Sequence, residues 1–332
     1  MRAVRIHRYG GPEELRLDEV PRPTPRPRDL IVRVHAASVN PVDAKLRGGG
    51  QRALMHYRLP WILGLDFSGE VVEVGEAVEG YRPGDAVFGY PTHRRPGSYA
   101  DFIAVDEREV APKPSSLTHI EAAGIPLVSL TAHTALVRKG RLEAGGKVLI
   151  HAGAGGVGSM AIQLAKALGA TVATTCSARN LELVRSLGAD HAIDYETEAF
   201  DERLSDYDLV VDTIGSETRE RSFRVLRRGG RLCTLIGGFP ELTEKYGVAL
   251  GAIVASAELV SLSIRGPLVH GVWVHHVIGW PNGEVLREVG ELVEAGTIEP
   301  LIDSVLPLEE IVEAHRRIES HRSRGKIILD LM

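Results

Sequence analysis

The sequence predicts an α/β protein with two domains, one built on a doubly wound parallel sheet and the other mostly β. A chain of 332 residues is long enough for about two domains. Residues 120–280 alternate apolar, strand-like runs with helical stretches, an order typical of a parallel sheet covered by helices on both faces. Residues 1–119 carry short β-rich runs separated by Gly/Pro turns, which indicates a barrel or sandwich.

The middle of the chain supplies six candidate strands for the parallel sheet. They are mainly apolar, because strands of a parallel sheet are buried on both faces. Helical stretches such as NLELVRSLG lie between them. In chain order the six runs read VLIHAG, TVATTC, HAIDY, DLVVDTIG, RLCTLIG and LVHGVWVHH.

The last fifty residues return to the first domain. They contain two helices, GEVLREVGELVEAGTIEP and PLEEIVEAHRRIES, followed by a terminal strand, GKIILDL. A terminal strand must pair with another strand, and the β-rich unit has a sheet to receive it. We therefore predict one domain from residues 1–119 and 281–332, with residues 120–280 inserted as the second.

A glycine-rich turn, HAGAGGVG, follows the strand-like run of residues 147–152. Three of its glycines fall in the G-x-G-x-x-G spacing: Gly153 allows the tight turn, Gly155 lets backbone approach a pyrophosphate, and Gly158 lets the next helix pack closely. The phosphates would lie on the unpaired N–H groups at the start of that helix. The pattern predicts a Rossmann dinucleotide site made by Gly153, Ala154, Gly155, Gly156, Val157 and Gly158.

Bulk properties exclude several classes of protein. The net charge of −5 and a pI near 6.2 give no electrostatic reason to expect nucleic acid or an anionic membrane. The N-terminal residues lack the apolar core of a signal peptide, and the most apolar run, GVALGAIVASAELVSLSI, is broken by Glu258 and predicts a helix packed on the sheet. Only Cys176 and Cys233 are present, too few for a disulfide framework. We expect a cytoplasmic protein without a membrane partner.

Motifs along the whole chain resemble those of the medium-chain dehydrogenase/reductases, in the zinc-free quinone oxidoreductase and enone reductase branch. The resemblance implies a GroES-like catalytic domain beside the Rossmann domain, hydride transfer from a nicotinamide to an electrophilic carbon, and a homodimer. The motifs are ASVNPVDAKLRGG, LGLDFSGEVVEVG, GDAVFGY, GSYADF, PLVSLTAHTAL, AGAGGVG, LGADHAIDY, VDTIG, PLEEIVEAH and GKIIL.

Catalytic zinc is not expected. Zinc requires Cys, His or carboxylate ligands, and the position that matches the family's first ligand is Asn40. The stretch that reads G-H-E in zinc-containing relatives is Gly64, Leu65 and Asp66, and the lobe with four cysteines is missing. Without a Lewis acid, oxidation of an unactivated alcohol is difficult, whereas hydride delivery to a quinone or an enone remains feasible.

The motif NPVDAK is the candidate for the acceptor site. By resemblance, Asn40, Asp43 and Lys45 would lie near the nicotinamide and its ribose, and an amide or ammonium there could stabilise enolate charge. Many quinone oxidoreductases carry Tyr where this chain has Lys45, which favours conjugated alkenes as acceptors. The alternative interpretation is that Lys45 is a surface lysine and Asp43 a turn residue. Proton delivery is expected from solvent, because no general acid is marked.

NADPH is the predicted cofactor. A carboxylate at the end of the second Rossmann strand would repel a 2′-phosphate, but the chain has Ser177 and Arg179 there, and a guanidinium matches phosphate geometry. By resemblance, Tyr195 lines the same pocket and Thr131 faces the cofactor. The alternative is that Arg179 merely opens a helix.

Two other functions stay open: an alcohol dehydrogenase-like oxidoreductase, and a non-catalytic protein that binds NADPH. The first is opposed by the missing zinc ligands, and measurements of NADPH oxidation would separate the second. The expected partner is a small-molecule quinone or enone. Its binding wall is expected around His56, Tyr57, Trp61 and residues 239–270.

Overall fold

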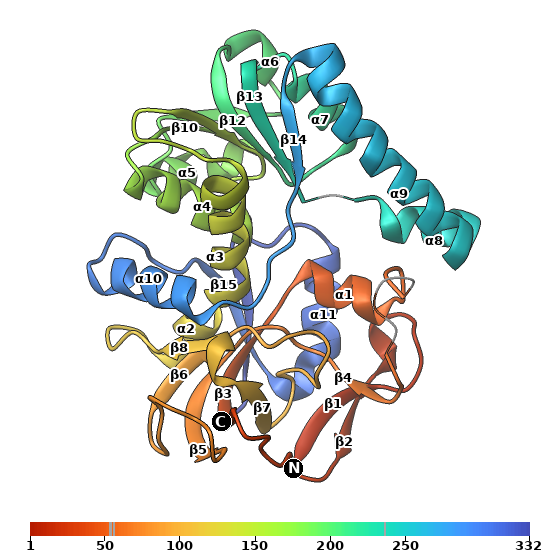
Figure 1. Ribbon diagram of the computed structural model, residues 1–332, viewed down its shortest axis with the longest axis vertical. Helices are drawn as coiled ribbons and strands as arrows, with labels where there is room; N and C mark the ends of the chain where they lie inside the picture. Colours follow the sequence, from red (N-terminus) through yellow and green to blue (C-terminus); the bar gives the residue numbers. More distant parts are fainter. Residues whose placement is uncertain (53–54, 56, 236) are drawn as a thin grey trace. The chain divides into compact units, whose positions relative to one another are not determined.

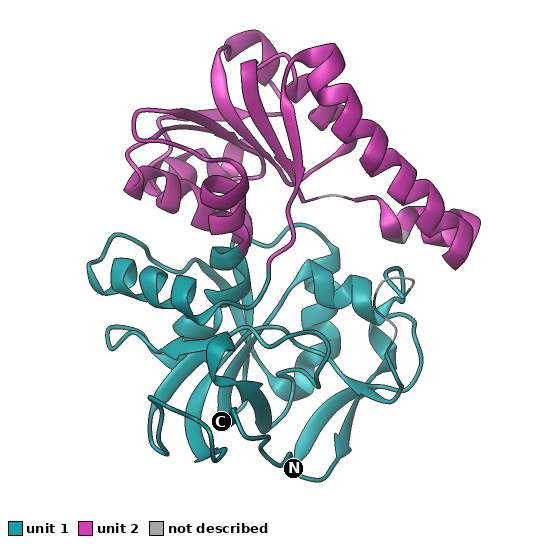
Figure 2. Cartoon of the chain, viewed as in Figure 1, with its two compact units in different colours: residues 1–130, 280–332 teal, residues 131–279 magenta. Residues whose placement is uncertain are grey.

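The computed structural model describes residues 1–332 except 53–54, 56 and 236. The chain divides into two compact units, which Figure 2 colours separately. Unit 1 comprises Met1–Leu130 and Trp280–Met332, and unit 2 comprises Thr131–Gly279. One unit is therefore built from both ends of the chain, with the other inserted between them.

Unit 2 is built on a six-stranded parallel sheet (Figure 1). The strand order is β11-β10-β9-β12-β13-β14, which is the doubly wound order with its reversal between β9 and β12. All six predicted strands are confirmed. Their bounds are β9 (Lys147–Ile150), β10 (Thr171–Cys176), β11 (His191–Asp194), β12 (Tyr207–Asp212), β13 (Leu226–Thr234) and β14 (Trp273–His276).

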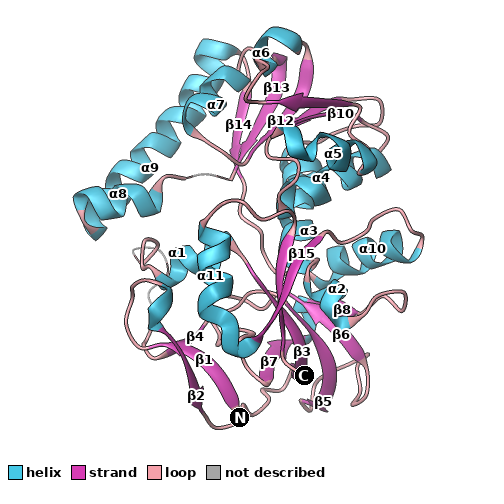
Figure 3. Cartoon of the chain, turned by 180° about the vertical axis from the view of Figure 1, so that it is seen from behind, coloured by secondary structure: helices cyan, strands magenta, loops and turns pink. Residues whose placement is uncertain are grey.

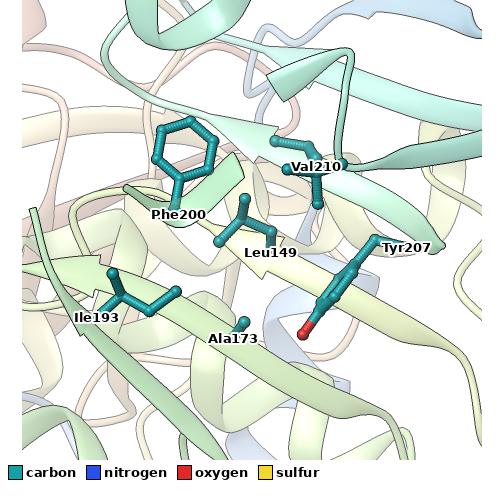
Figure 4. Close-up of a cluster of buried hydrophobic side chains, with 7 residues drawn as sticks. Leu149, Ala173, Ile193, Phe200, Tyr207 and Val210 are labelled. Atoms are coloured by element: carbon teal, nitrogen blue, oxygen red, sulfur yellow. The ribbon is translucent and has the colours of Figure 1, made fainter. Parts of the chain in front are cut away.

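Helices connect the strands of unit 2, as Figure 3 shows. They are α4 (Gly156–Ala167), α5 (Leu181–Ser186), α6 (Phe200–Arg203), α7 (Ser216–Ser222), α8 (Phe239–Tyr246) and α9 (Val248–Arg265). A π-helical stretch, Thr134–Lys139, precedes β9, and a second, Gly266–His270, continues α9. Under one part of the sheet, a cluster of buried side chains centred on Leu149 packs against Phe200 and Tyr207 (Figure 4). This apolar layer anchors the strand that carries the glycine turn.

Helix α9 departs from its prediction. It packs on the core through Leu262, which lies in one cluster with Leu232 and Val274. The stretch Val248–His270 is nevertheless long and apolar enough to cross a membrane by length and composition, and only 17 % of its apolar window is buried. The prediction of a helix packed on the sheet is thus right for one face only. The rest of the apolar helix surface is exposed, and Glu258 does not divide it.

Unit 1 holds a seven-stranded mixed sheet and a three-stranded one. The larger sheet has the order β15-β16-β3-β5-β6-β8, with β7 paired to β3, and the smaller has the order β2-β1-β4. The bounds are β1 (Arg2–Ile6), β2 (Leu15–Glu19), β3 (Asp29–Val39), β4 (Trp61–Ile62), β5 (Phe67–Val74), β6 (Ala86–Gly89), β7 (Phe102–Asp106), β8 (Val110–Pro112), β15 (Ile302–Pro307) and β16 (Lys326–Asp330). The terminal strand β16 pairs antiparallel with β3, as predicted.

The helices of unit 1 are α1 (Pro41–Arg47), α2 (His119–Ala123), α10 (Gly283–Glu294) and α11 (Ile311–Glu319), and α3 (Pro126–His133) spans the boundary. The predicted boundary at residue 120 differs from the observed one after Leu130. Helix α2 stays with unit 1 because Ala123 packs against Ala36 and Ile328 of the larger sheet. No apolar pattern in the sequence records that contact.

Candidate functional site

The glycine turn of unit 2 is tightly packed at two of its three motif glycines. A Cβ on Gly153 would lie 2.1 Å from Thr174 Oγ1, and one on Gly158 would lie 2.2 Å from the Ala152 carbonyl oxygen. A Cβ on Gly155 would meet only that same oxygen, at 3.4 Å. The protein's own atoms therefore require glycine at the first and third positions, whereas the missing side chain of Gly155 keeps the space above the turn open to a ligand.

The left-handed residue of this turn is Ala152, with φ of 55°, rather than Gly153. Gly153 is needed for its close approach to β10, so its predicted role changes from turn formation to packing. Ala154 is buried, and α4 begins at Gly156 with Gly155 as its N-cap. The first N–H groups of α4 have no partner within their own helix, which makes them available to an anion.

His151, directly before the turn, links the turn to two neighbouring elements through its ring, a role that the sequence did not reveal. Its ring is fully buried, with Nδ1 3.0 Å from Thr175 Oγ1 and Nε2 2.9 Å from Ser222 Oγ. Burial lowers the pKa of His151 to about 4, against the opposing pull of the Asp212 carboxylate. The neutral ring therefore acts as a structural link between β9, β10 and α7.

The residues predicted for cofactor selectivity follow two neighbouring strands. Ser177 and Arg179 come directly after β10, and Tyr195 directly after β11. The Tyr195 N–H donates to the Cys176 carbonyl at 3.1 Å, so the ends of both strands meet at one edge of the sheet. Arg179 is exposed and Tyr195 is 60 % exposed, which leaves a guanidinium and a phenol accessible there.

Thr131 lies in α3 and is almost fully buried. A Cβ on Gly279 would lie 2.7 Å from Thr131 Oγ1, so the backbone that follows β14 passes directly over this hydroxyl. Because the strands are parallel, the segments after β9, β10, β11 and β14 all leave the sheet at its carboxyl edge. The predicted cofactor residues of unit 2 therefore share that edge.

Unit 1 contains a closed cluster of buried polar groups around Asp66. The Asp66 Oδ2 atom accepts from Ser38 Oγ at 2.5 Å and Asn40 Nδ2 at 2.9 Å, and it lies 3.1 Å from Lys326 Nζ. Its Oδ1 accepts from the Leu127 N–H at 2.7 Å. Lys326 also donates to Asn40 Oδ1. The four side chains of the cluster are buried and the two charges are paired with each other, as burial requires.

This cluster changes the role expected for Asn40. Its amide oxygen accepts from Lys326, and its amide nitrogen donates to Asp66 and to the Ser38 carbonyl at 3.4 Å. Both polar atoms are therefore used within the protein, and only 1 % of the residue is exposed. In this arrangement Asn40 holds the start of α1 and does not offer its amide to an acceptor.

Asp43 is fully buried in the first turn of α1, where its Oδ2 accepts from the Asn40 N–H at 2.9 Å. Burial raises the pKa of Asp43 to about 7, despite that hydrogen bond and the nearby Lys326 ammonium. The Tyr99 hydroxyl interacts electrostatically with the carboxyl group. Among the described residues, however, neither Asp43 Oδ1 nor this hydroxyl has a partner with full hydrogen-bond geometry.

Lys45 is the accessible member of the predicted trio. It lies on α1 and is half-buried, whereas Asn40 and Asp43 are inside the unit. Tyr57 and Trp61, both named for the expected binding wall, stack with ring centroids 4.8 Å apart, and Tyr57 is buried. His56, also expected in that wall, lies outside the described residues.

Lys326 is the residue that the sequence analysis missed. It belongs to the GKIIL stretch, which supported the resemblance without suggesting a role for its lysine. Its partner Asn40 lies 286 residues earlier in the chain. The available signal was that Lys326 opens the terminal strand directly before the apolar run IIL, which must be buried.

Comparisons with known proteins agree with both units. Residues 26–115 match the alcohol dehydrogenase GroES-like domain, residues 129–221 the alanine dehydrogenase/PNT C-terminal domain, and residues 187–329 the zinc-binding dehydrogenase family. The NAD(P)H oxidoreductase RTN4IP1 of zebrafish is 38 % identical over 92 % of this chain and 84 % of its own length. The chain belongs to the zinc-free quinone oxidoreductase and enone reductase branch of the medium-chain dehydrogenases.

Other members of this branch include a chloroplastic NADPH-dependent alkenal/one oxidoreductase of Arabidopsis thaliana, 34 % identical over 97 % of this chain and 77 % of its own length. The quinone oxidoreductase of Coxiella burnetii has the same architecture, with a TM-score of 0.85, 32 % identity, and coverage of 100 % of this chain and 99 % of its own. The predicted fold class, a GroES-like domain with a Rossmann domain, is thereby confirmed.

Two structural observations concern the positions that hold zinc in other medium-chain dehydrogenases. The Lys326 ammonium lies against both Asn40 and Asp66, so a positive charge already stands at the positions that match zinc ligands in other medium-chain dehydrogenases. Within the part of the chain that the structure describes, no three His, Cys, Asp or Glu residues are grouped to hold a metal ion.

The prediction of a cytoplasmic location is wrong. The finding that contradicts it is that the RTN4IP1 relatives from zebrafish, mouse, cattle and human are named as mitochondrial proteins. The prediction rested on the lack of an apolar signal peptide, and that observation says nothing about import into mitochondria.

Proposed function

We propose that this protein is a reductase that transfers hydride from NADPH to the β-carbon of an α,β-unsaturated carbonyl compound, or to a quinone. The observation that carries the proposal is the Lys326–Asp66 pair with Asn40. An internal ammonium at the metal position repels a second cation, so the unit lacks a Lewis acid to activate an alcohol. Acceptors that are already electrophilic do not need one.

NADPH is the cofactor of this reaction. The open space above Gly155 and the N–H groups at the start of α4 fit a pyrophosphate. Ser177, Arg179 and Tyr195 at the same sheet edge fit a 2′-phosphate, with the guanidinium supplying charge-assisted hydrogen bonds. The bound dihydronicotinamide supplies the hydride.

Lys45 is the proposed donor to the acceptor's oxygen. It is the accessible member of the NPVDAK motif, and its ammonium can stabilise the negative charge that develops on an enolate. Removal of one such donor typically costs about 2.7–4 kcal/mol in the barrier. Asn40 and Asp43 then act by holding α1 in place, and the proton that completes the reduction comes from solvent.

A conjugated alkene is favoured over a quinone within this proposal. Many quinone oxidoreductases carry Tyr at the position of Lys45, and an ammonium is the stronger stabiliser of an enolate oxygen. The Arabidopsis relative is named as an alkenal/one oxidoreductase, while the Coxiella burnetii relative is named as a quinone oxidoreductase. The two acceptor classes therefore need a direct comparison.

The test is a steady-state assay of NADPH oxidation with a series of enones, a series of quinones, and no acceptor. We expect acceptor-dependent turnover, with a larger kcat/KM for enones and a saturated carbonyl product. Turnover only with an alcohol and NADP⁺ would establish the alcohol dehydrogenase alternative. Tight NADPH binding without turnover of any acceptor would establish a non-catalytic role.

We also propose a homodimer, as the family resemblance implies. Among the described residues the outer strand β14 pairs only with β13, and an unpaired strand edge can pair with a strand of another chain. Sedimentation equilibrium across micromolar concentrations tests the assembly. A single species of 36.0 kDa would overturn it.

A further inference from the structure

Arg47, the last residue of α1, is a buried guanidinium that donates in three directions. Only 2 % of the residue is exposed. Its Nε donates to the Gly10 carbonyl at 3.1 Å, its Nη1 to His315 Nδ1 at 2.9 Å, and its Nη2 to the Glu319 carboxylate. The Arg47 carbonyl in turn accepts from the Gly10 N–H at 3.1 Å. We name Arg47, His315 and Glu319 the Arg47 cluster.

His315 is the neutral member of the Arg47 cluster. Its ring is fully buried, and burial and the Arg47 charge lower the pKa of His315 to about 3. A guanidinium can only donate, so Nδ1 accepts from Arg47 and the ring hydrogen lies on Nε2. The Tyr99 ring meets His315 edge to face, with centroids 5.9 Å apart at 86°, and the Tyr99 hydroxyl interacts with the Asp43 carboxyl group. His315 therefore connects to both ends of α1.

Helix α11 supplies two members of the Arg47 cluster from one face. His315 and Glu319 are four residues apart, so their side chains lie one above the other on the helix surface. Figure 1 shows α1 beside α11, and the two helices are in contact. The fork of Arg47 spans both side chains, which fixes the end of α1 against the last turn of α11.

The seven residues of α1 are thus held at both ends. At the first turn, Asp43 accepts from the Asn40 N–H at 2.9 Å, and at the last residue Arg47 joins α11. Asp43 and Arg47 are four residues apart and face inward together. Lys45 lies two residues from each, about 200° around the helix, and is half-buried. The rotation of α1 about its axis therefore sets the direction in which Lys45 leaves the helix.

The Arg47 cluster contributes geometry more than net stability. The side chains of Arg47 and Glu319 are 3 % and 40 % exposed, and pairs with a buried charge add little stability over apolar side chains of the same size. A planar guanidinium with several partners has a fixed direction, which an apolar side chain or a lysine does not provide. The sequence places such a group two residues from the proposed enolate donor.

We propose that Arg47, fixed by His315 and Glu319, is a positioning residue for Lys45: it sets the rotation of α1 so that the Lys45 ammonium meets the acceptor oxygen. The inference rests on the proposed role of Lys45 in the reduction. Donors that act in the transition state must be placed closely, and a displacement of about 1 Å can lower a rate by about 100-fold. NADPH binding is assigned to residues of unit 2, so it should not depend on the Arg47 cluster.

The first test measures kcat for an enone in variants of Glu319, the most exposed member of the Arg47 cluster. Glu319→Ala should lower kcat by about tenfold or more, with NADPH affinity unchanged. Glu319→Gln keeps an acceptor oxygen for Arg47 and should recover most of the loss. The matched control is Glu313→Ala, which removes the exposed ion pair with Arg317 on the same helix and should leave kcat unchanged. Equal losses in the two alanine variants would overturn the assignment.

The second test is a double-mutant cycle with Lys45→Ala. If the Arg47 cluster acts through Lys45, Glu319→Ala should cause no further loss of kcat in the Lys45→Ala background. A merely structural role predicts losses that multiply in the double variant, and that result would overturn the proposal. Urea denaturation of each variant shows whether its kcat is that of a folded protein.

Arg47→Lys provides an independent variant, because it keeps the charge and loses the planar fork. Its kcat should fall while NADPH affinity is retained, and if this variant does not fold, the Glu319 series decides. A wild-type kcat in Lys45→Ala for every acceptor would overturn the proposed role of Lys45 and this inference with it. A low kcat in Lys45→Ala beside a wild-type kcat in Glu319→Ala would overturn the positioning role alone.

Discussion

Lys326 Nζ lies 3.1 Å from Asp66 Oδ2, and the two side chains are only 4 % and 0 % exposed. The same ammonium donates to Asn40, whose amide donates to Asp66. Lys326 begins β16, Asn40 directly follows β3 and Asp66 directly precedes β5, so the three side chains join three strands in one closed network. A buried ion pair adds little net stability, but the loss of one partner leaves an unpaired charge in the interior. Removal of the lysine alone should therefore reduce stability.

Lys326→Met should lower the free energy of unfolding by about 3–5 kcal/mol, because the buried Asp66 carboxyl group loses its ion-pair partner. The measurement is urea denaturation at neutral pH. Lys166→Met is the control: its pair with Asp190 is 36 % and 38 % exposed, and such pairs contribute about 0–1 kcal/mol. The double variant Lys326→Met/Asp66→Asn should recover part of the loss, and equal costs for the two single lysine variants would contradict the assignment.

Activity should not depend on a metal ion. The ammonium of Lys326 stands against Asn40 and Asp66, and a divalent cation there would meet direct repulsion. Prolonged dialysis against a strong chelator should leave NADPH oxidation unchanged. Loss of turnover that Zn²⁺ alone restores would refute this prediction.

Lys45→Ala should lower kcat for an enone more than it weakens NADPH binding. A charge that acts only as the enolate forms contributes to the transition state and not to cofactor affinity. Steady-state kinetics and an NADPH titration measure the two effects separately. The control variant Lys166→Ala, at a lysine of unit 2, should change neither kcat nor NADPH affinity. An unchanged kcat/KM of Lys45→Ala for every acceptor would show that Lys45 is an ordinary surface residue.

Arg179→Ala should weaken NADPH binding by about tenfold or more, at about 1.4 kcal/mol per decade, and should change NADH binding little. The reason is that only the 2′-phosphate accepts charge-assisted hydrogen bonds from this exposed guanidinium. A higher salt concentration should reduce the preference for NADPH over NADH, because dissolved ions screen the attraction between Arg179 and the 2′-phosphate at the surface. Arg185→Ala on α5 is the control, and equal losses for both cofactors would show that Arg179 supports the helix.

Asp43 should make folding less favourable as pH rises from about 4 to about 7. Its pKa is near 7 in the folded protein and near the ordinary 3.8 when unfolded, so the folded state binds more protons in this window and loses stability as pH rises. The charged or titratable groups that interact with it are Asp66, Lys326, Tyr57, Tyr90 and Tyr99.

The opposite trend comes from His119, His151 and His315, whose pKa values burial lowers to about 4, about 4 and about 3. These rings favour folding more strongly as pH rises. The pH dependence of the free energy of unfolding of the wild type is therefore the sum of the two opposing contributions. The Asp43→Asn variant isolates the contribution of the carboxyl group. Its free energy of unfolding, measured relative to that of the wild type, should increase between pH 4 and 7. A difference that does not vary with pH would contradict the raised pKa.

The fold followed from the sequence where the pattern is local. The glycine turn between β9 and α4, the six strands of unit 2 and the pairing of the last strand with unit 1 were all predicted, because periodicity and turn residues act over a few positions. The specific function of each turn glycine was less accessible. Gly153 is required by Thr174, a residue of the next strand, and only the packing of β9 on β10 brings them together.

The sequence by itself determined the two architectures, the glycine turn between β9 and α4, and the replacement of the family's zinc ligands at Asn40 and Asp66. The tertiary structure decided which side chains meet: Lys326 reaches residues 260 and 286 positions away, and His151 joins three elements. It also decided that α9 has an exposed apolar face, because burial depends on what covers a helix rather than on its composition. Partners so distant in the chain are set by strand register and by layer packing, which no short stretch of sequence encodes.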